Sequence, residues 1–146
     1  MKIEIRTPQS LEEWEKYYDL RYRILRKPLN QPKGSEKNDG DQIGIHFALY
    51  QEKVLQAVVR LDLQENHTAQ VRFMAVEENQ QKKGFGKKIM IEIENYCLKN
   101  NIQKIILHAR DHAVDFYFKL GYKVIEPSHK LFGIIQHFLM EKYLIS

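Results

Sequence analysis

The sequence predicts one domain of the α/β (α+β) class. The chain has 146 residues, the size of an ordinary domain, and its 43% of apolar residues suffice for one hydrophobic core. Segments with strand patterns alternate with helical ones, in the order strand, helix, three strands, helix, strand, helix and two strands. Since no internal repeat, low-complexity tract or linker interrupts this order, we expect residues 1–146 to form a single unit.

The first third of the chain reads as a strand, a helix and a loop. Apolar and polar residues alternate over residues 3–5, as in a short strand. Ser10–Glu13 matches a capping box, in which two side chains satisfy amides at a helix start, and apolar residues at helical spacing continue to Leu25. The helix should end before Pro28. Residues 27–43 carry two prolines and two glycines, so we expect a loop with room for a short helical turn.

The middle of the chain contains strands on either side of a long helix. Ile43–Leu63 reads as two strands joined by a turn at Glu52-Lys53, and Ala69–Val76 as a third. A helical apolar stripe runs from Gly84 to about Asn100. The nearly continuous apolar run Ile102–Ala109 predicts a central strand buried on both faces.

The last part of the chain predicts a short helix and two closing strands. The helix should run from about Ala113 to Leu120, because Gly121 is a favourable residue just beyond a helix end. Tyr122–Ile125 and roughly Phe132–Lys142 have strand patterns.

Composition excludes several classes of protein. No run of 18 apolar residues is present, so we expect no transmembrane helix and no membrane partner. The N-terminus lacks the apolar stretch of a signal peptide, and a single cysteine, Cys97, allows no internal disulfide, so a cytoplasmic location fits best. The net charge of +4 is mild and spread along the chain, which argues against a nucleic-acid partner. No zinc-ligand spacing or complete calcium loop is found, so we expect no metal.

The segment Val71–Lys88 carries the strongest functional signal. From Gln81 it reads Gln-x-x-Gly-x-Gly, with lysines in between, at the start of the long helix. The first amides of a helix lack intrahelical partners and the helix dipole is positive there, so these residues favour a bound anion such as a polyphosphate. A glycine-rich turn beside a solvated basic helix end would have the same pattern.

Two common phosphate motifs do not fit this segment. A Walker loop needs a hydroxyl residue after its lysine, but Lys88 follows Gly86-Lys87. A dinucleotide fingerprint needs a third glycine at position 89, where Ile89 stands.

Two motifs resemble those of the GCN5-related N-acetyltransferases, the GNAT family. Gln81, Gly84 and Gly86 match motif A, Gln/Arg-x-x-Gly-x-Gly/Ala. The stretch Ala113–Tyr122, AVDFYFKLGY, matches motif B, Ala-x-x-Phe-Tyr-x-Lys-x-Gly-Phe/Tyr. The motifs are separated by one helix and one strand, as in the family, and the resemblance covers residues 3–142. The short chain and its HARDHA segment are similar to the ElaA-like branch.

The resemblance implies the fold and the cofactor. The GNAT fold is a mixed, mostly antiparallel sheet of six to seven strands, flanked by helices and splayed between the fourth and fifth strands, and residues 1–146 would form one N-acetyltransferase domain. Because this fold often dimerises, a homodimer is one expectation. The cosubstrate would be acetyl-CoA, with no metal. The expected cofactor-binding residues are Met74, Ala75, Val76, Gln81, Lys82, Lys83, Gly84, Phe85, Gly86, Lys87 and Tyr117.

The resemblance also implies direct attack of a primary amine on the thioester. Tyr117 matches the general acid that protonates the departing CoA sulfur, and a phenol is a reasonable donor to a thiolate. The position of the general base varies in the family. By residue type the candidates here are His46, His108, Asp111, His112 and His137, and we expect His108 or His112 to serve because they bracket the end of the predicted central strand. Family members often carry asparagine where this chain has Arg110, which could reach a CoA phosphate or an acidic substrate.

The acceptor amine stays open. Candidate substrate-binding residues are Arg21, Arg23, His46 and His137. A non-catalytic acyl-CoA-binding module on the same fold is the main alternative, although a pure binder has no need of the acid Tyr117. A small nucleic-acid binder that uses the basic cluster is a third interpretation, without a recognised module to support it.

Overall fold

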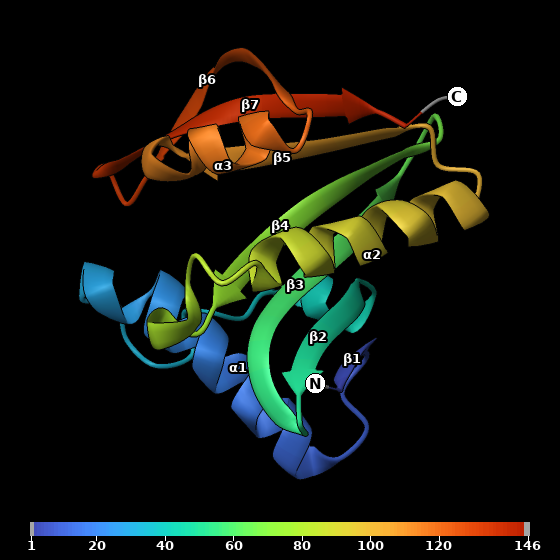
Figure 1. Ribbon diagram of the computed structural model, residues 1–146. Coiled ribbons are helices and arrows are strands. Elements are labelled where there is room, and N and C mark those ends of the chain that lie inside the picture. Colours follow the sequence, from blue (N-terminus) through green and yellow to red (C-terminus); the bar gives the residue numbers. More distant parts are fainter. Residues whose placement is uncertain (1, 145–146) are drawn as a thin grey trace.

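The computed structural model describes residues 2–144, and its centre is a seven-stranded sheet with the order β1-β2-β3-β4-β5-β7-β6 (Figure 1). The strands are β1 (Ile3–Arg6), β2 (Ile45–Gln51), β3 (Val54–Gln64), β4 (Thr68–Val76), β5 (Lys104–Arg110), β6 (Lys123–Leu131) and β7 (Ile135–Tyr143). The α-helices are α1 (Leu11–Leu25), α2 (Phe85–Lys99) and α3 (Val114–Lys119). Short 3-10 helices are η1 (Lys27–Leu29), η2 (Asp39–Gln42), η3 (Glu78–Gln80) and η4 (Asp111–Ala113).

The sheet splits between β4 and β5. All neighbouring strands pair antiparallel except these two, which pair in parallel from Thr68↔Lys104 only as far as Val71↔Leu107. Beyond that point the strands separate, as Figure 1 shows. The predicted mixed sheet of six to seven strands and its splay between the fourth and fifth strands are therefore confirmed.

The hydrophobic core consists of two apolar layers, one on each face of the sheet. One layer contains Ile89 and Ile93 of α2, Tyr117 of α3, and Leu107 of β5. The other layer lies beneath α1 and contains Tyr17 and Leu20 with Val58 and Ala75 of the sheet. Because successive side chains of a strand point to opposite faces, strands β2, β3 and β4 each contribute to both layers.

Strand β4 contains a bulge in its second half. Its pairing with β3 shifts between Val58↔Ala75 and Arg60↔Arg72, so Phe73 and Met74 together oppose Val59. Phe73 has φ 55°, in the left-handed region that a bulky residue seldom adopts. The bulge interrupts the alternation, and Phe73 consequently packs beneath α1 while Met74 packs on the α2 side.

Three local expectations are corrected. The Ser10 side chain accepts the N–H of Glu13, but the Glu13 carboxylate accepts the N–H of Gln9 and pairs with Arg6, so the reciprocal half of the capping box is displaced by one residue. The loop after α1 holds two 3-10 helices rather than one turn. The two closing strands also differ from expectation: β6 is longer and continues to Leu131, and β7 begins later, at Ile135.

Strand β5 is buried on one face and not on both. Ile105, Leu107 and Ala109 are buried, while the residues between them are partly exposed. The buried residues pack in the α2 layer, and His108 and Arg110 therefore point to the α1 side. The split sheet leaves that side open, because β4 no longer lies beside this end of β5.

Candidate active site

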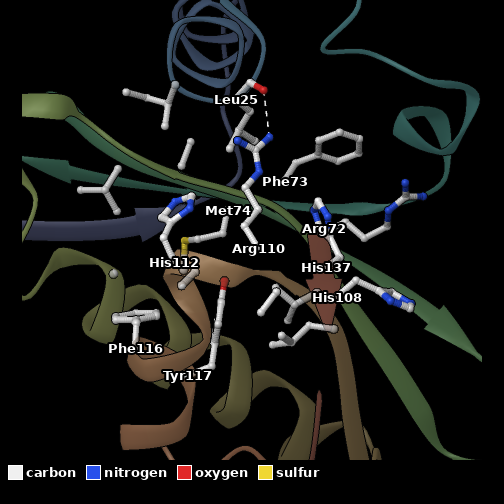
Figure 2. Close-up of a pocket in the computed structure, with 18 of the residues that line it drawn as sticks. Leu25, Arg72, Phe73, Met74, His108, Arg110, His112, Phe116, Tyr117 and His137 are labelled. Carbon is white, nitrogen blue, oxygen red and sulfur yellow. Dashed lines mark hydrogen bonds between the residues drawn. The ribbon is translucent and has the colours of Figure 1, made fainter. Parts of the chain in front are cut away.

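A cavity of about 930 Å³ occupies the split in the sheet. It extends from the start of α2 to the end of α1, and strands β4 and β5 form its walls. Such a volume is in the range of small-molecule sites. Figure 2 shows side chains from both sides of the gap pointing into this space.

The two faces of the sheet contribute different chemistry to the cavity. On the α2 side the lining includes Met74, Val76, Tyr117 and the start of α2. On the α1 side it includes His108 and Arg110, with other basic residues. A ligand in the gap therefore meets amides and a phenol on one side and arginines and histidines on the other.

The start of α2 is open to an anion. Gly84 is the N-cap residue with φ +88°, and no side chain among the described residues caps the helix. The first-turn amides, which have no intrahelical partners, remain available, and Gln81, Lys82 and Lys87 line the cavity beside them. A Cβ on Gly86 would lie 3.0 Å from the tip of the Phe116 ring, so glycine lets α3 approach this turn closely.

The free edge of β4 leads directly to this helix start. Pairing with β5 ends at Val71, so the segment from Arg72 to Val76 has no neighbouring strand on that side among residues 2–144. Gln81 Nε2 donates to the Val76 carbonyl at 3.2 Å, which connects the strand end to the glycine-rich turn. An extended ligand could add to this edge like a strand.

Tyr117 projects from α3 into the cavity (Figure 2). Its side chain is 6% exposed and its ring lies edge-on to Phe116 and Tyr122, at centroid distances of 4.9 and 5.9 Å. Burial raises the pKa of Tyr117 above the usual value of a phenol, so the hydroxyl keeps its proton at neutral pH.

Three histidines meet on the opposite face. The rings of His129 and His137 stack at 4.4 Å, and His108 lies 5.3 Å from His129 and contacts the Ser128 hydroxyl at 2.9 Å. His137 Nδ1 lies 3.0 Å from the carbonyl oxygen of Ile135. A carbonyl can only accept, so Nδ1 carries the proton and Nε2 of the neutral ring has a free lone pair. Burial, followed by neighbouring basic groups, lowers the pKa of His137.

His112 also lines the cavity but at its rim. Its side chain is 72% exposed, and its Nδ1 lies 3.6 Å from an oxygen of Asp111. The two histidines expected to serve as bases therefore differ, because His108 is partly enclosed with a lowered pKa due to burial, whereas His112 faces solvent.

Three expected substrate contacts lie outside the cavity lining. Arg21 is fully buried and donates to Asp41 and to the Glu36 carbonyl. His46 is buried too, with Nε2 at 2.9 Å from the Asp41 carbonyl and Nδ1 at 2.8 Å from the Tyr17 hydroxyl. These contacts leave neither residue free to meet a ligand.

Arg23 lies at the surface, outside the cavity lining. It pairs with both oxygens of Glu77 at 2.7 and 3.0 Å, and with Asp19.

Two predicted cofactor-binding residues of the glycine-rich turn contribute no side chain to the cavity lining: Lys83 is exposed and Phe85 is buried in the core. Their backbone amides still belong to the start of α2.

Several lining residues were not predicted from the sequence. They are Arg26, Gln70, Arg72, Phe73, Phe116 and His129, with apolar residues of α1, β4, β5, β6 and η4. One signal was present for β5, where Lys104, His108 and Arg110 alternate with apolar residues and so indicate a polar face. Arg26 and Arg72 carry no such local signal, because their place depends on the folding of distant segments.

Comparison with known proteins decides the family. The sequence model described as "Acetyltransferase (GNAT) domain" matches residues 8–144. The chain belongs to the GNAT family. This membership agrees with both sequence motifs and with the split sheet, and it makes the protein an acyltransferase.

Similar proteins match this GNAT protein over nearly its whole length. The uncharacterized N-acetyltransferase YitI of Bacillus subtilis is 25% identical over 136 residues, covering 89% of this chain and 91% of YitI. An aminoglycoside 6'-N-acetyltransferase solved with coenzyme A superimposes with a TM-score of 0.83 at 17% identity, covering 100% of this chain and 98% of that one. Escherichia coli ElaA superimposes with a TM-score of 0.79 at 17% identity, covering 97% and 98%. At such identities the structural likeness is one of fold. Within residues 2–144, none of the helices has the length and apolar character needed to cross a membrane.

Proposed function

We propose that this GNAT protein transfers an acetyl group from acetyl-CoA to a primary amine by direct attack. The observation that carries the proposal is that an uncapped helix start, a free strand edge and a buried tyrosine all lie in one cavity. Solved relatives with coenzyme A bound, such as the aminoglycoside enzyme, support the choice of cofactor.

Each part of acetyl-CoA has a counterpart in the cavity. The pyrophosphate would lie against the amides of Gly84, Phe85 and Gly86, with Lys82, Lys83 and Lys87 around it. The amides of the pantetheine arm would pair with the β4 edge at Met74, Ala75 and Val76. The thioester would then enter the gap beside Tyr117.

The chemistry requires one proton to leave the amine and one to reach the sulfur. The amine nitrogen attacks the thioester carbonyl, the C–S bond breaks, and the thiolate takes the phenolic proton of Tyr117. The attacking nitrogen loses its proton to a base on the acceptor's side. Of the histidines there, His137 has the best-defined free lone pair, at Nε2, and we propose it as that base; His108 and His112 are the alternatives.

Binding and turnover of acetyl-CoA test the proposal. Calorimetry should show saturable binding, and a thiol-release assay with a library of amines should show turnover. Binding without thiol release from any amine would favour the non-catalytic acyl-CoA-binding module, and no binding at millimolar acetyl-CoA would exclude both.

Replacing Gly84 with valine should weaken acetyl-CoA binding at least ~10-fold. A valine at φ +88° costs on the order of 1–3 kcal/mol, and relief of that strain would turn the first amides of α2 away from the phosphates. Calorimetric titration measures the change. The matched control is Gly34→Val, because Gly34 has φ +105° and open space around it but lies outside the cavity lining. Equal losses of affinity in the two variants would contradict the assignment of this turn.

Replacing His137 with asparagine should lower kcat by about 100-fold and remove the acidic limb of its pH profile. The pKa of His137 is lowered, so the neutral base persists to pH values below the ordinary 6.5, and kcat should fall only as the pH drops further. Turnover measured from pH 5 to 8 at saturating substrates shows the limb. His67→Asn is the control, since His67 contacts the Asn101 carbonyl away from the cavity. An unchanged profile in His137→Asn would exclude this residue as the base.

A further inference from the structure

The arginines of this protein fall into two groups. The chain has seven, and four of them pair with carboxylates: Arg6, Arg21, Arg23 and Arg60. The other three, Arg26, Arg72 and Arg110, form no ion pair with any residue between 2 and 144, and all three line the cavity. None of the four paired arginines lines it. The cavity therefore collects the guanidinium groups that form no ion pair with the described residues.

The fold holds two of these guanidinium groups through backbone oxygens. Arg110 Nη2 donates to the Leu25 carbonyl at 2.9 Å, drawn as the dashed line in Figure 2. Arg26 donates to the carbonyls of Ser35 and Leu25 at 3.1 and 3.2 Å, and its guanidinium lies 5.6 and 5.5 Å from the ring centres of Phe73 and Phe132. An arginine has five N–H donors, so both retain donors for a ligand.

Arg72 makes the fewest polar contacts of the three arginines. Its guanidinium lies 5.1 Å from the centre of the Phe73 ring, and no hydrogen bond or ion pair to it is found within the described part of the chain. Phe73 thus lies beneath both Arg26 and Arg72, and its position in the bulge turns it to the α1 side.

The positive charge in this part of the cavity is only partly compensated, because Asp62 and Asp41 act on Arg72, and Glu36 on Arg26, from outside the lining. No aspartate or glutamate is among the described residues that line it. Burial first, and then the neighbouring arginines, lower the pKa values of Arg26 and Arg110, as expected for like charges held together. Enclosed charges without partners are costly, so a bound anion would stabilise this arrangement.

The position of the cluster separates it from the expected phosphate site. Arg110 and His137 are paired in register across β5 and β7 and share the α1 face, whereas the glycine-rich turn and Tyr117 belong to the α2 face. Arg72 precedes the end of β4 by four residues, roughly 13 Å of extended strand. The anion bound here would consequently belong to the second substrate and not to the pyrophosphate.

We infer that the acceptor is a small amine that also carries a carboxylate or a phosphate, bound by Arg26, Arg72 and Arg110. The inference rests on the proposed function, since it names the substrate class of the same site. The planar guanidinium matches both kinds of anion in a bidentate geometry, and the anion would orient the amine toward the histidines. Polycationic amines are excluded by the same charges.

Matched pairs of amines test the inference. Glycine is compared with glycinamide, and O-phosphoethanolamine with ethanolamine, in the thiol-release assay with acetyl-CoA saturating. We expect kcat/KM at least 50-fold higher for the anionic member of one pair, and which pair responds distinguishes a carboxylate from a phosphate. Spermidine should give no turnover. Equal rates within both pairs, or preference for spermidine, would overturn the inference and leave acetyl transfer intact.

Arginine variants show where the anion binds. Arg72→Gln and Arg110→Gln should each raise the KM of the anionic amine by 10- to 100-fold without changing the Kd of acetyl-CoA, and Arg72→Lys should restore little. Arg23→Gln is the control, because that residue pairs with Glu77 outside the cavity lining. A higher Kd for acetyl-CoA with an unchanged acceptor KM would mean that the cluster serves the cofactor, which would contradict the inference.

Binding without turnover separates failure of the inference from failure of the function. Glycine and O-phosphoethanolamine, each with its neutral partner, are titrated into the CoA-saturated protein by calorimetry. Anion-dependent binding that is lost in Arg72→Gln and Arg110→Gln supports the anion site even if no amine is acetylated. Equal binding of charged and neutral partners would overturn it.

Discussion

Tyr117→Phe is expected to lower kcat by about 100-fold or more while leaving the affinity for acetyl-CoA unchanged. Phenylalanine keeps the ring that packs on Phe116 and Tyr122, so the cavity should keep its shape. It removes the hydroxyl whose pKa is raised by burial and which therefore carries a proton at neutral pH. The thiolate would then leave without its donor. Steady-state thiol release measures kcat, and calorimetry with acetyl-CoA measures affinity.

Tyr96→Phe is the matched control for this prediction. Tyr96 also belongs to the α2 layer, where its ring lies edge-on to Phe47 at 5.6 Å, but it does not line the cavity. The same substitution there should leave kcat near that of the unmodified protein. If Tyr117→Phe kept full turnover, the phenol would not be the acid, and the proton would have to come from another donor such as water.

The second large effect concerns stability: Asp41→Ala should lower the free energy of unfolding by roughly 3–5 kcal/mol, because it leaves two buried arginines without their shared partner. Asp41 Oδ1 accepts from Arg21 and Arg60, each at 2.8 Å, and Oδ2 accepts from the Asn38 N–H at 2.9 Å. The two arginine side chains are 0% and 1% exposed. Urea denaturation at neutral pH measures the loss.

The pH dependence of stability provides a check on Asp41. Although burial raises its pKa, the bonds from Asn38, Arg21 and Arg60 lower it below 3.8 overall. A lowered carboxylate pKa adds stability above the unfolded value, and this is lost as the pH falls below about 4. Asp39→Ala is the control, because Asp39 is exposed in the same 3-10 helix and should cost at most about 0.5 kcal/mol. Equal losses in both variants would refute the role of the buried pairs.

Features encoded by neighbouring residues were predictable from the sequence. The glycine-rich turn and the α3 motif each lie within about ten residues, and their chemistry follows from the helix start and from the placement of Tyr117. The split in the sheet followed from the family resemblance rather than from the pattern itself. The sequence pattern of an apolar strand is the same whether the neighbouring strand stays paired with it or separates from it.

Features that join distant segments could not be predicted in this way. Arg26, Arg72 and Arg110 come from the end of α1, the bulge of β4 and the end of β5, and only the fold brings them together. Arg21 shows the converse case. Its place near the end of a helix suggested an accessible cation, but Asp41, 20 residues further along, draws it into the interior.

The short pairing between β4 and β5 also affects how the protein is held together. Within residues 2–144, only four residue pairs join the two parts of the sheet directly, and β5, β7 and β6 pair with one another beyond them. A cofactor arm that lies along the free edge of β4 would add contacts between the two parts of the sheet. Binding of the cofactor would then raise the free energy of unfolding, by ~2.7 kcal/mol at a cofactor concentration of a hundred times Kd. Local opening of the cofactor-free protein should begin at this seam.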